Sequence, residues 1–180
     1  MKAEELFDLG LRHHTKKEYP RALALFEEAA EQGHVPAMLW SGVCYDFALG
    51  APQDYKKAFD LYARAAEAGN AEAQWRLGYF YLYAQGTAYD PASAYLWFER
   101  SAKQKDQMGK QLFAQAQEEA EWRYRELLAL LPNRDPAALY AAGLCCKYGI
   151  GTKKDAEKAK LYLSRAAEAG YAPAERALRE

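Results

Sequence analysis

A glycine and an aspartate recur at one fixed spacing along this chain of 180 residues. The pairs are Gly42 and Asp54, Gly78 and Asp90, and Gly143 and Asp155, and in each the aspartate comes 12 positions after the glycine (54−42, 90−78, 155−143). An alanine follows each aspartate four places later, and the first two glycines are separated by one period of 36 (78−42). Self-similarity at a fixed period predicts a repeat protein. Such a scaffold usually offers a binding surface rather than a reaction site.

Each aspartate precedes a run of apolar residues at helical spacing. After Asp54 these residues fall at steps 0, 3, 4, 7 and 8, at Ala58, Leu61, Tyr62, Ala65 and Ala66. That spacing places them in one stripe along a helix, and a preceding aspartate can cap the free amides of the first turn. Asp54, Asp90 and Asp155 are therefore predicted to be structural N-caps, each at the start of an amphipathic helix.

Glycines divide each unit into two helices. Gly69 and Gly170 follow an aspartate at the same spacing (69−54, 170−155), at the place where a left-handed residue ends a helix. Gly50, Gly86 and Gly151 mark a turn before each aspartate, and the helices that precede these turns are expected to begin near Ala37, Ala73 and Ala138. Each unit is predicted to be a helical hairpin.

The residues that recur in register resemble the Sel1-like repeat. The pattern is carried best by the third unit, at Ala73, Gly78, Tyr81, Gly86, Asp90, Ala94, Trp97 and Phe98. The resemblance implies an all-α fold, a right-handed α-solenoid of helical hairpins related to tetratricopeptide repeats. It also implies an adaptor without chemistry of its own, so the chain is not expected to be an enzyme.

The ends of the repeat array depart from this pattern. Gly10 precedes Ala22 by 12 positions where Gly42 precedes Ala58 by 16 (22−10, 58−42), so the first turn is shorter and resembles that of a tetratricopeptide repeat. The glycine expected at position 105 is Lys105, and no turn signal follows between residues 111 and 131, which predicts one irregular long helix around 107–131. We expect one domain, 1–180, divided into a tetratricopeptide-like hairpin at 1–34, Sel1-like repeats at 35–70, 71–106 and 136–171, an irregular helical segment at 107–135 and a C-terminal capping helix at 172–180.

Charge and composition narrow the choice of partners. The chain has 24 basic and 25 acidic residues, a net charge of −1, which gives no broad positive field for nucleic acid or an anionic membrane. No apolar run is long enough to cross a membrane and the amino terminus does not resemble a secretory signal, so a cytoplasmic location is expected. Three cysteines are too few for a disulfide framework and are expected to be small apolar fillers.

No set of residues in the sequence indicates catalysis, a metal or a cofactor. The three histidines, His13, His14 and His34, are expected to be solvated at the surface. The segment 149–154 superficially resembles a phosphate-binding loop, but it follows a predicted helix and occupies the turn of the repeat.

The first helix of each hairpin lines the concave groove in tetratricopeptide-like solenoids, and the glycine register identifies the positions concerned. Most of these positions are apolar or aromatic, and 14 tyrosines and four tryptophans make the chain rich in such side chains. The predicted partner-binding residues are Phe7, Leu39, Phe47, Trp75, Tyr79, Tyr83, Tyr140, Lys147 and Tyr148. Packing between helices is the alternative for any one of them, whereas Trp75, Tyr79 and Tyr83 form a ridge at four-residue spacing that favours recognition.

The sequence thus predicts a protein–protein interaction adaptor that binds a peptide or protein loop in an aromatic concave groove. One alternative is a small-molecule or peptide-ligand module that uses the same groove, closed by the segment near Trp122 and Tyr124. Another is a toxin-neutralising or signalling partner that acts through a convex or irregular surface, as the resemblance to bacterial Sel1-like proteins implies. Self-association through the groove is a further alternative.

Overall fold

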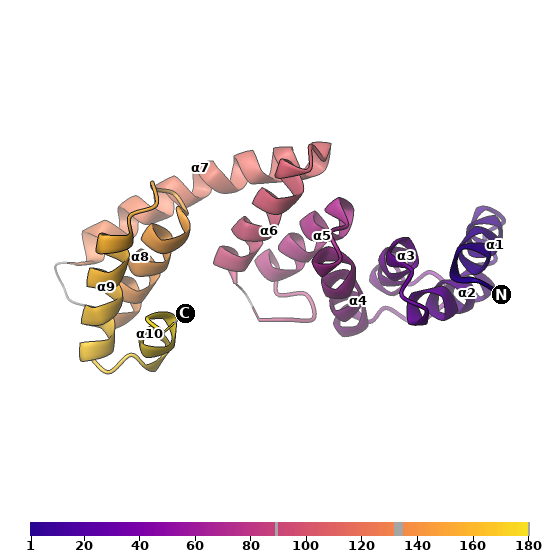
Figure 1. Ribbon diagram of the computed structural model, residues 1–180, viewed down its shortest axis with the longest axis horizontal. Coiled ribbons are helices and arrows are strands. Elements are labelled where there is room, and N and C mark those ends of the chain that lie inside the picture. Colours follow the sequence, from indigo (N-terminus) through magenta and orange to yellow (C-terminus); the bar gives the residue numbers. More distant parts are fainter. Residues whose placement is uncertain (89, 132–134, 180) are drawn as a thin grey trace. The chain divides into compact units, whose positions relative to one another are not determined.

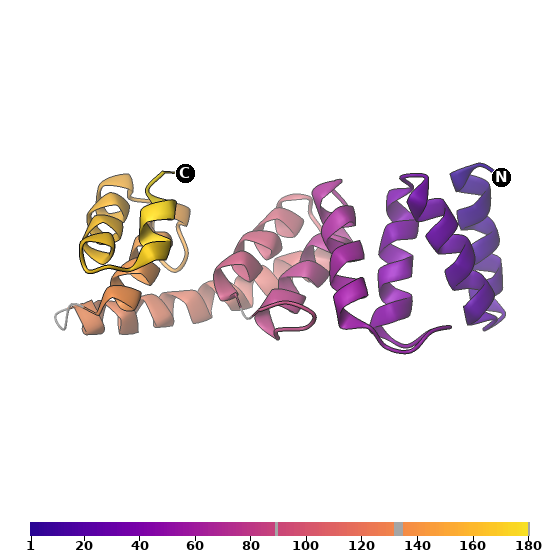
Figure 2. The same cartoon turned by 90° about the horizontal axis from the view of Figure 1, so that it is seen from below.

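The computed structural model describes residues 1–88, 90–131 and 135–179, and these contain α-helices joined by turns and no strand. The helices are α1 (Ala3–Thr15), α2 (Tyr19–Glu31), α3 (Val35–Asp46), α4 (Tyr55–Glu67), α5 (Ala71–Leu82), α6 (Pro91–Lys103), α7 (Gln107–Leu130), α8 (Pro136–Tyr148), α9 (Ala156–Glu168) and α10 (Ala172–Ala177). Helices α1 and α2, α3 and α4, α5 and α6, and α8 and α9 pair as hairpins (Figures 1 and 2). The predicted all-α fold of hairpins is confirmed, as are the long helix, α7, and the terminal helix, α10, which packs against α9.

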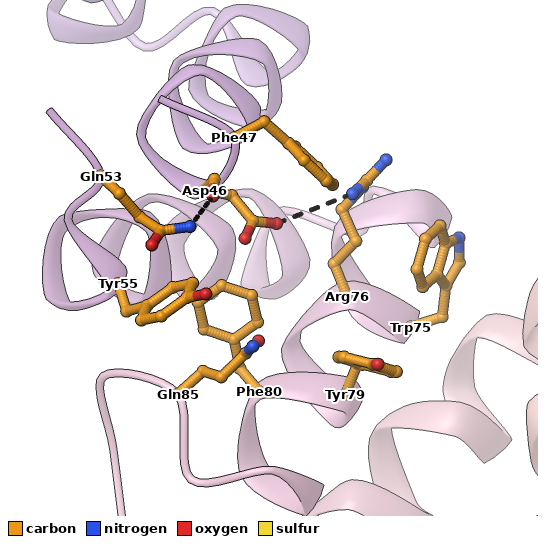
Figure 3. A pocket seen from close by; sticks show the side chains of 9 residues that line it. All are labelled: Asp46, Phe47, Gln53, Tyr55, Trp75, Arg76, Tyr79, Phe80 and Gln85. Atoms are coloured by element: carbon orange, nitrogen blue, oxygen red, sulfur yellow. Dashed lines mark hydrogen bonds and ion pairs between the residues drawn. The ribbon is translucent and has the colours of Figure 1, made fainter. Parts of the chain in front are cut away.

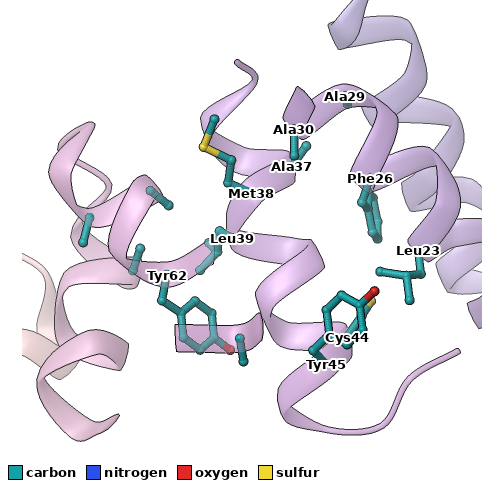
Figure 4. Packing of buried hydrophobic residues seen from close by; sticks show 14 of the residues in the cluster. Leu23, Phe26, Ala29, Ala30, Ala37, Met38, Leu39, Cys44, Tyr45 and Tyr62 are labelled. Carbon is teal, nitrogen blue, oxygen red and sulfur yellow. The ribbon is translucent and has the colours of Figure 1, made fainter. Parts of the chain in front are cut away.

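The contacts divide the chain into two compact units, residues 1–112 and 113–180, and the boundary falls within α7. In the first unit the buried side chains form one continuous core from Leu6 to Phe80, part of which is drawn in Figure 4. In the second unit a smaller core surrounds Leu139, Ala166 and Ala174. None of the helices in the described ranges is both long and apolar enough to cross a membrane.

A glycine on the first helix of each hairpin lies against a large side chain on the second. A Cβ atom on Gly42 would stand 2.7 Å from the ring of Tyr62, and one on Gly78 would stand 2.6 Å from the ring of Phe98. The other two hairpins repeat the arrangement, with Gly10 against Phe26 and Gly143 against Leu163. The recurring glycine therefore lets a bulky side chain sit directly on the backbone of the facing helix.

The recurring aspartates cap the second helices. The carboxylate of Asp54 accepts a hydrogen bond from the backbone N–H of Lys57 (3.0 Å), and that of Asp155 accepts one from Lys158 (2.9 Å). Asp90 accepts from both Ala92 (3.1 Å) and Ser93 (3.0 Å). Each bond satisfies an amide of the first helical turn that has no partner within its own helix.

The first helices begin two residues earlier than the sequence pattern indicates, at Val35, Ala71 and Pro136. Polar residues before them are the reason: His34 accepts from the N–H of Ala37 (3.2 Å) and Asn70 from that of Ala73 (2.8 Å). Asp135 does the same for Ala137 (3.1 Å). A cap one residue before each helix fixes where that helix starts.

The expectation that the histidines are solvated is wrong. His34 uses one ring nitrogen to cap α3 and the other to contact Glu4 at 2.8 Å. His13 contacts the carboxylate of Glu18 at 2.5 Å, and the ring of His14 packs edge-on against that of Trp40. The His13 contact also lowers the pKa of Glu18. All three histidines thus hold helices of the first two hairpins in place.

The cysteines are free thiols, and Cys44 and Cys146 are buried. Burial raises the pKa of Cys44 and of Cys145 to about 11, because a thiolate is poorly solvated there. Both are therefore thiols at neutral pH, which fits a packing role.

Lys105 adopts the conformation that the missing glycine would have had. Its φ is +67°, in the left-handed region that Gly33, Gly69 and Gly170 occupy at the equivalent helix ends. Helix α6 therefore ends here although no glycine follows it. The turn between α6 and α7 is kept even though the glycine that predicts it is absent from the sequence. A non-glycine residue in this region is strained by about 1–2 kcal/mol.

Replacing Lys105 by glycine is expected to stabilise the first unit. The substitution removes the strain but gives the unfolded chain more freedom, so the net gain should be about 0.5–1 kcal/mol. Urea denaturation followed by circular dichroism measures it. The matched control is Gly69→Ala, which places a side chain at an equivalent helix end and should lower the free energy of unfolding. A destabilised Lys105→Gly variant would contradict the prediction.

Candidate functional site

One pocket in the first unit combines aromatic walls with a half-buried ion pair. Its volume is about 450 Å³, and it lies where α3, the turn after α3, the start of α4, and α5 meet (Figure 3). The residues that line it are Asp46, Phe47, Gln53, Tyr55, Trp75, Arg76, Tyr79, Phe80 and Gln85. The pocket is therefore built by two consecutive hairpins and depends on their packing.

The aromatic side chains of the pocket differ in how far they are buried. Phe80 is buried in the core and meets the ring of Tyr55 edge-on, with 5.9 Å between centroids. Phe47 and Tyr79 remain 58% and 39% exposed. Tyr79 stacks on Tyr83 with ring centroids 4.3 Å apart, and Tyr83 is itself 58% exposed. Phe80 is thus part of the scaffold, whereas the other rings present apolar surface to a ligand.

Asp46 and Arg76 provide the charged groups of the pocket. Their side chains are 4.0 Å apart, and that of Asp46 is 13% exposed. The hydroxyl of Tyr62 donates a hydrogen bond to the carboxylate of Asp46 (3.1 Å). Burial raises the pKa of Asp46, while the Tyr62 hydrogen bond and the charge of Arg76 oppose this increase. Both neighbours therefore favour the charged form of this carboxylate.

The guanidinium of Arg76 is held by several partners at once. It donates to the carboxylate of Glu72 through Nε (3.0 Å) and through Nη2 (2.8 Å). It also lies over the ring of Trp75, with 4.6 Å between Cζ and the centroid, and 6.0 Å from that of Phe47. Arg76 is thus a fixed cation stacked among aromatic rings.

The structure brings together three of the predicted binding residues, Phe47, Trp75 and Tyr79, with Tyr83 beside them through its contact with Tyr79. Phe7 packs against the rings of Phe26 and His34. Leu39 is buried in the core of the first unit. These last two predicted residues, Phe7 and Leu39, hold helices together and do not line the pocket.

The remaining predicted residues, Tyr140, Lys147 and Tyr148, belong to α8 in the second unit. The ring of Tyr140 stacks on that of Tyr171 (5.1 Å between centroids). The ammonium of Lys147 donates to the backbone carbonyl of Ala177 at the end of α10 (2.9 Å) and lies over the ring of Tyr148. Within the second unit, the terminal helix therefore engages the side chains of α8.

Sequence reasoning missed Arg76, Tyr55 and Gln85 as pocket residues. Arg76 follows Trp75 directly, so it is not on the four-residue ridge of Trp75, Tyr79 and Tyr83. Tyr55 starts the second helix of the second hairpin, and Gln85 belongs to the turn of the third. The only signal for Tyr55 and Gln85 in the sequence is that they stand beside the recurring Asp54 and Gly86.

The described residues contain no group of three or more His, Cys, Asp or Glu side chains placed to hold a metal ion. The sequence model of the Sel1 repeat matches residues 5–34, 35–70, 71–106 and 136–171, which include all four hairpins. The chain belongs to the Sel1 repeat family. Proteins of this family are generally scaffolds for protein–protein interaction and typically have no enzymatic activity. The match includes the first hairpin, whose turn is shorter, and leaves out residues 107–135.

Solved structures of Sel1 repeat proteins have the same fold. One is c5321, a protective antigen present in uropathogenic Escherichia coli strains that displays an SLR fold; it is 24% identical, with a TM-score of 0.57 over 98% of this chain and 48% of c5321. Another is a Sel1 repeat protein from Oxalobacter formigenes, 25% identical with a TM-score of 0.60 over 96% of this chain and 74% of the other. The present chain thus spans about half the length of c5321. No curated protein matches its sequence.

Proposed function

We propose that this Sel1 repeat chain is a non-catalytic adaptor that holds a peptide or an exposed protein loop in the pocket of its first unit. The observation that carries the proposal is the exposure of Phe47 and Tyr79 on the walls of one concave site, with Tyr83 stacked beside them. Large apolar rings exposed around a cavity are typical of recognition surfaces. Tyrosine and phenylalanine also lose little side-chain entropy when they bind.

The charged groups of the pocket would orient the bound segment. Asp46 and Arg76 are held in place by Tyr62 and Glu72, so their oxygens and N–H groups have fixed directions before a partner arrives. Fixed polar groups among apolar walls give specificity and orientation more than affinity. The proposed binding residues are therefore Phe47, Trp75, Tyr79 and Tyr83 for contact area, with Asp46 and Arg76 for orientation.

A second candidate is a small-molecule ligand in the same pocket. The volume of about 450 Å³ lies within the range of about 300–1,000 Å³ that is typical of small-molecule sites. Native mass spectrometry of the purified chain distinguishes the two: a retained small molecule supports this candidate, whereas a bound polypeptide supports the adaptor.

Selection from a random peptide library displayed on phage tests the adaptor function directly. We expect the full chain to enrich peptides, and the double substitution Trp75→Ala with Tyr79→Ala to reduce the affinity of a synthesised winner by about a hundredfold or more, as loss of two central aromatic contacts would. Isothermal titration calorimetry measures the affinity, and circular dichroism checks that helicity is unchanged.

The matched control is Leu161→Ala on α9, because Leu161 is similarly exposed but belongs to the second unit. This variant should bind the peptide as the unchanged chain does. Equal loss of affinity in the control, or loss of helicity in the double variant, would argue against the pocket as the binding site.

A further inference from the structure

Helix α7 begins as the first helix of another hairpin. The caps His34, Asn70 and Asp106 follow one another at the repeat period of 36 (70−34, 106−70). Each accepts a hydrogen bond from the backbone N–H three residues later, and for Asp106 that residue is Gly109 (2.7 Å). The amino-terminal part of α7 is therefore in register with the starts of α3 and α5.

The carboxy-terminal part of α7 is in register with the second helix of a hairpin. A Cβ atom on Gly50, Gly86 or Gly151 would stand within 2.5 Å of the backbone of Tyr19, Tyr55 or Ala120 respectively. The spacing in the sequence is the same for all three pairs (50−19, 86−55, 151−120). Tyr19 and Tyr55 are the first residues of α2 and α4. Ala120 has the same relation to the following turn, although it lies inside a helix.

A contact between side chains repeats the correspondence. The hydroxyl of Tyr124 is 3.4 Å from the sulfur of Cys146, and the rings of Phe59 and Tyr81 meet edge-on. Tyr124 follows Phe59 by the same number of positions as Cys146 follows Tyr81 (124−59 equals 146−81). Ala120 follows Tyr55 by that number too (120−55). The second part of α7 thus packs against α8 as α4 packs against α5.

Helix α7 is consequently a hairpin that has lost its turn. The caps of α7 and α8, Asp106 and Asp135, are closer in the sequence than one repeat, and their separation (135−106) is shorter by seven than the period of 36. In the second hairpin the residues between α3 and α4 number eight, 47–54. Without seven of them the two arms cannot fold back, and they continue as one helix (Figure 1).

Both arms expose a face that complete hairpins cover. Ala114 corresponds to Gly78 (114−78 is one repeat) and is exposed, whereas Gly78 is buried under Phe98. Arg123 corresponds to Ala58 by the offset that relates Ala120 to Tyr55 (123−58), and Arg123 is exposed whereas Ala58 is buried. Trp122, the residue before Arg123, is 57% exposed. Each arm therefore lacks the helix that it is patterned to pack against.

We propose that a second copy of this chain supplies the missing helices. Two α7 helices would pack antiparallel about a twofold axis, so that the first arm of each molecule meets the second arm of the other and two hairpins are completed at once. In the antiparallel pair, the second arm of the second copy lies beside the first arm of this chain, and its first arm lies beside the second arm of this chain. Exchange of equivalent elements of this kind is a low-cost route to a symmetric dimer.

The charges of α7 are complementary in this arrangement. Gly78 faces Phe98 in a complete hairpin. Gly78 corresponds to position 114 of α7 (78+36), and Phe98 corresponds to Tyr62 one repeat earlier (98−36) and hence to position 127 (62+120−55). If position 114 of one copy faces position 127 of the other in an antiparallel pair, facing positions always add up to 241, and the axis passes between positions 120 and 121. Glu118 then lies opposite Arg123 of the second copy (118+123 is also 241), and Arg123 already donates to Glu119 of its own chain at 2.6 Å. The arrangement thus places Glu118 of each copy opposite Arg123 of the other.

The mass of the full chain in solution tests the proposal. Light scattering after size-exclusion chromatography should give twice the chain mass of 20.3 kDa. Ala114→Glu and Arg123→Glu should each raise the dimer dissociation constant by about tenfold or more, because the first places a charge in the helix interface and the second places a carboxylate opposite Glu118 of the second copy. Leu161→Lys on α9 is the control and should leave the mass of the dimer unchanged.

An insertion gives the converse test. A copy of residues 47–53 placed between Glu118 and Glu119 restores the seven missing turn residues, so that the hairpin can close within one chain. We expect this variant to be monomeric, with the helical content of the unchanged chain. A monomeric starting protein, or a dimer that survives both the insertion and Ala114→Glu, would overturn the proposal. Peptide binding in the pocket does not enter either measurement, so the two proposals fail independently.

Discussion

Replacement of Gly86 by alanine should destabilise the first unit by about 3 kcal/mol. Gly86 has a φ of +65°, which is strained for alanine, and its new Cβ atom would stand 2.5 Å from the carbonyl carbon of Tyr55 and closer still to the oxygen. That carbonyl belongs to the backbone at the start of α4, so it cannot move aside as a flexible side chain would. The turn or the helix must shift, and urea denaturation followed by circular dichroism measures the cost.

Gly69→Ala separates the two causes of this loss. Gly69 has a φ of +91°, and no atom lies within 4 Å of its added Cβ, so this variant should lose only about 1 kcal/mol from backbone strain. The remainder in Gly86→Ala comes from the contact with Tyr55. Because Tyr55 and Gln85 also line the pocket, Gly86→Ala should weaken peptide binding, whereas Gly69→Ala should not. Equal losses of stability in both variants would show that the close approach to Tyr55 does not matter.

The sequence was sufficient for the hairpins because their signals are local. A cap such as Asp54, a turn glycine such as Gly86 and the helical spacing of the apolar residues between them each act within a few residues. What Gly86 packs against was not predictable in this way, because Tyr55 is distant in the sequence and belongs to another hairpin. At position 105 the local signal was misleading, since Lys105 adopts a conformation typical of glycine.

The pocket was predictable in part. Phe47, Trp75 and Tyr79 follow from the repeat register, which gives their positions on α5 and at the end of α3. The register does not say which side chains turn inward, so Phe7 and Leu39 were predicted for the groove although they pack between helices. Nor does it give the ion pair of Arg76 with Asp46, which depends on the distance between two hairpins. Whether the exposed residues bind a partner stays a prediction.

Tyr62→Ala should have the largest effect on the first unit, about 3–5 kcal/mol of the free energy of unfolding. The side chain is 0% exposed, lies directly on Gly42 and meets the ring of Phe80 edge-on at 5.2 Å. Its removal leaves a cavity between α3, α4 and α5 that rigid backbones cannot fill. Because these helices also build the pocket, peptide binding should be lost together with stability.

Tyr62→Phe isolates the contribution of the hydroxyl group. The ring still fills the space on Gly42, but Asp46 loses a donor at 3.1 Å, so the loss at neutral pH should be about 1–2 kcal/mol. Burial holds the pKa of Asp46 above its ordinary 3.8, and removal of the hydroxyl raises it further. The folded state then binds the proton of Asp46 more tightly than the unfolded state does, and stability falls as the pH rises from 3.8 through the folded pKa. The difference between Tyr62→Phe and the unchanged chain should therefore be smaller in acid, where Asp46 is neutral, than at neutral pH. A difference that is the same at both pH values would mean that the hydroxyl does not act through Asp46.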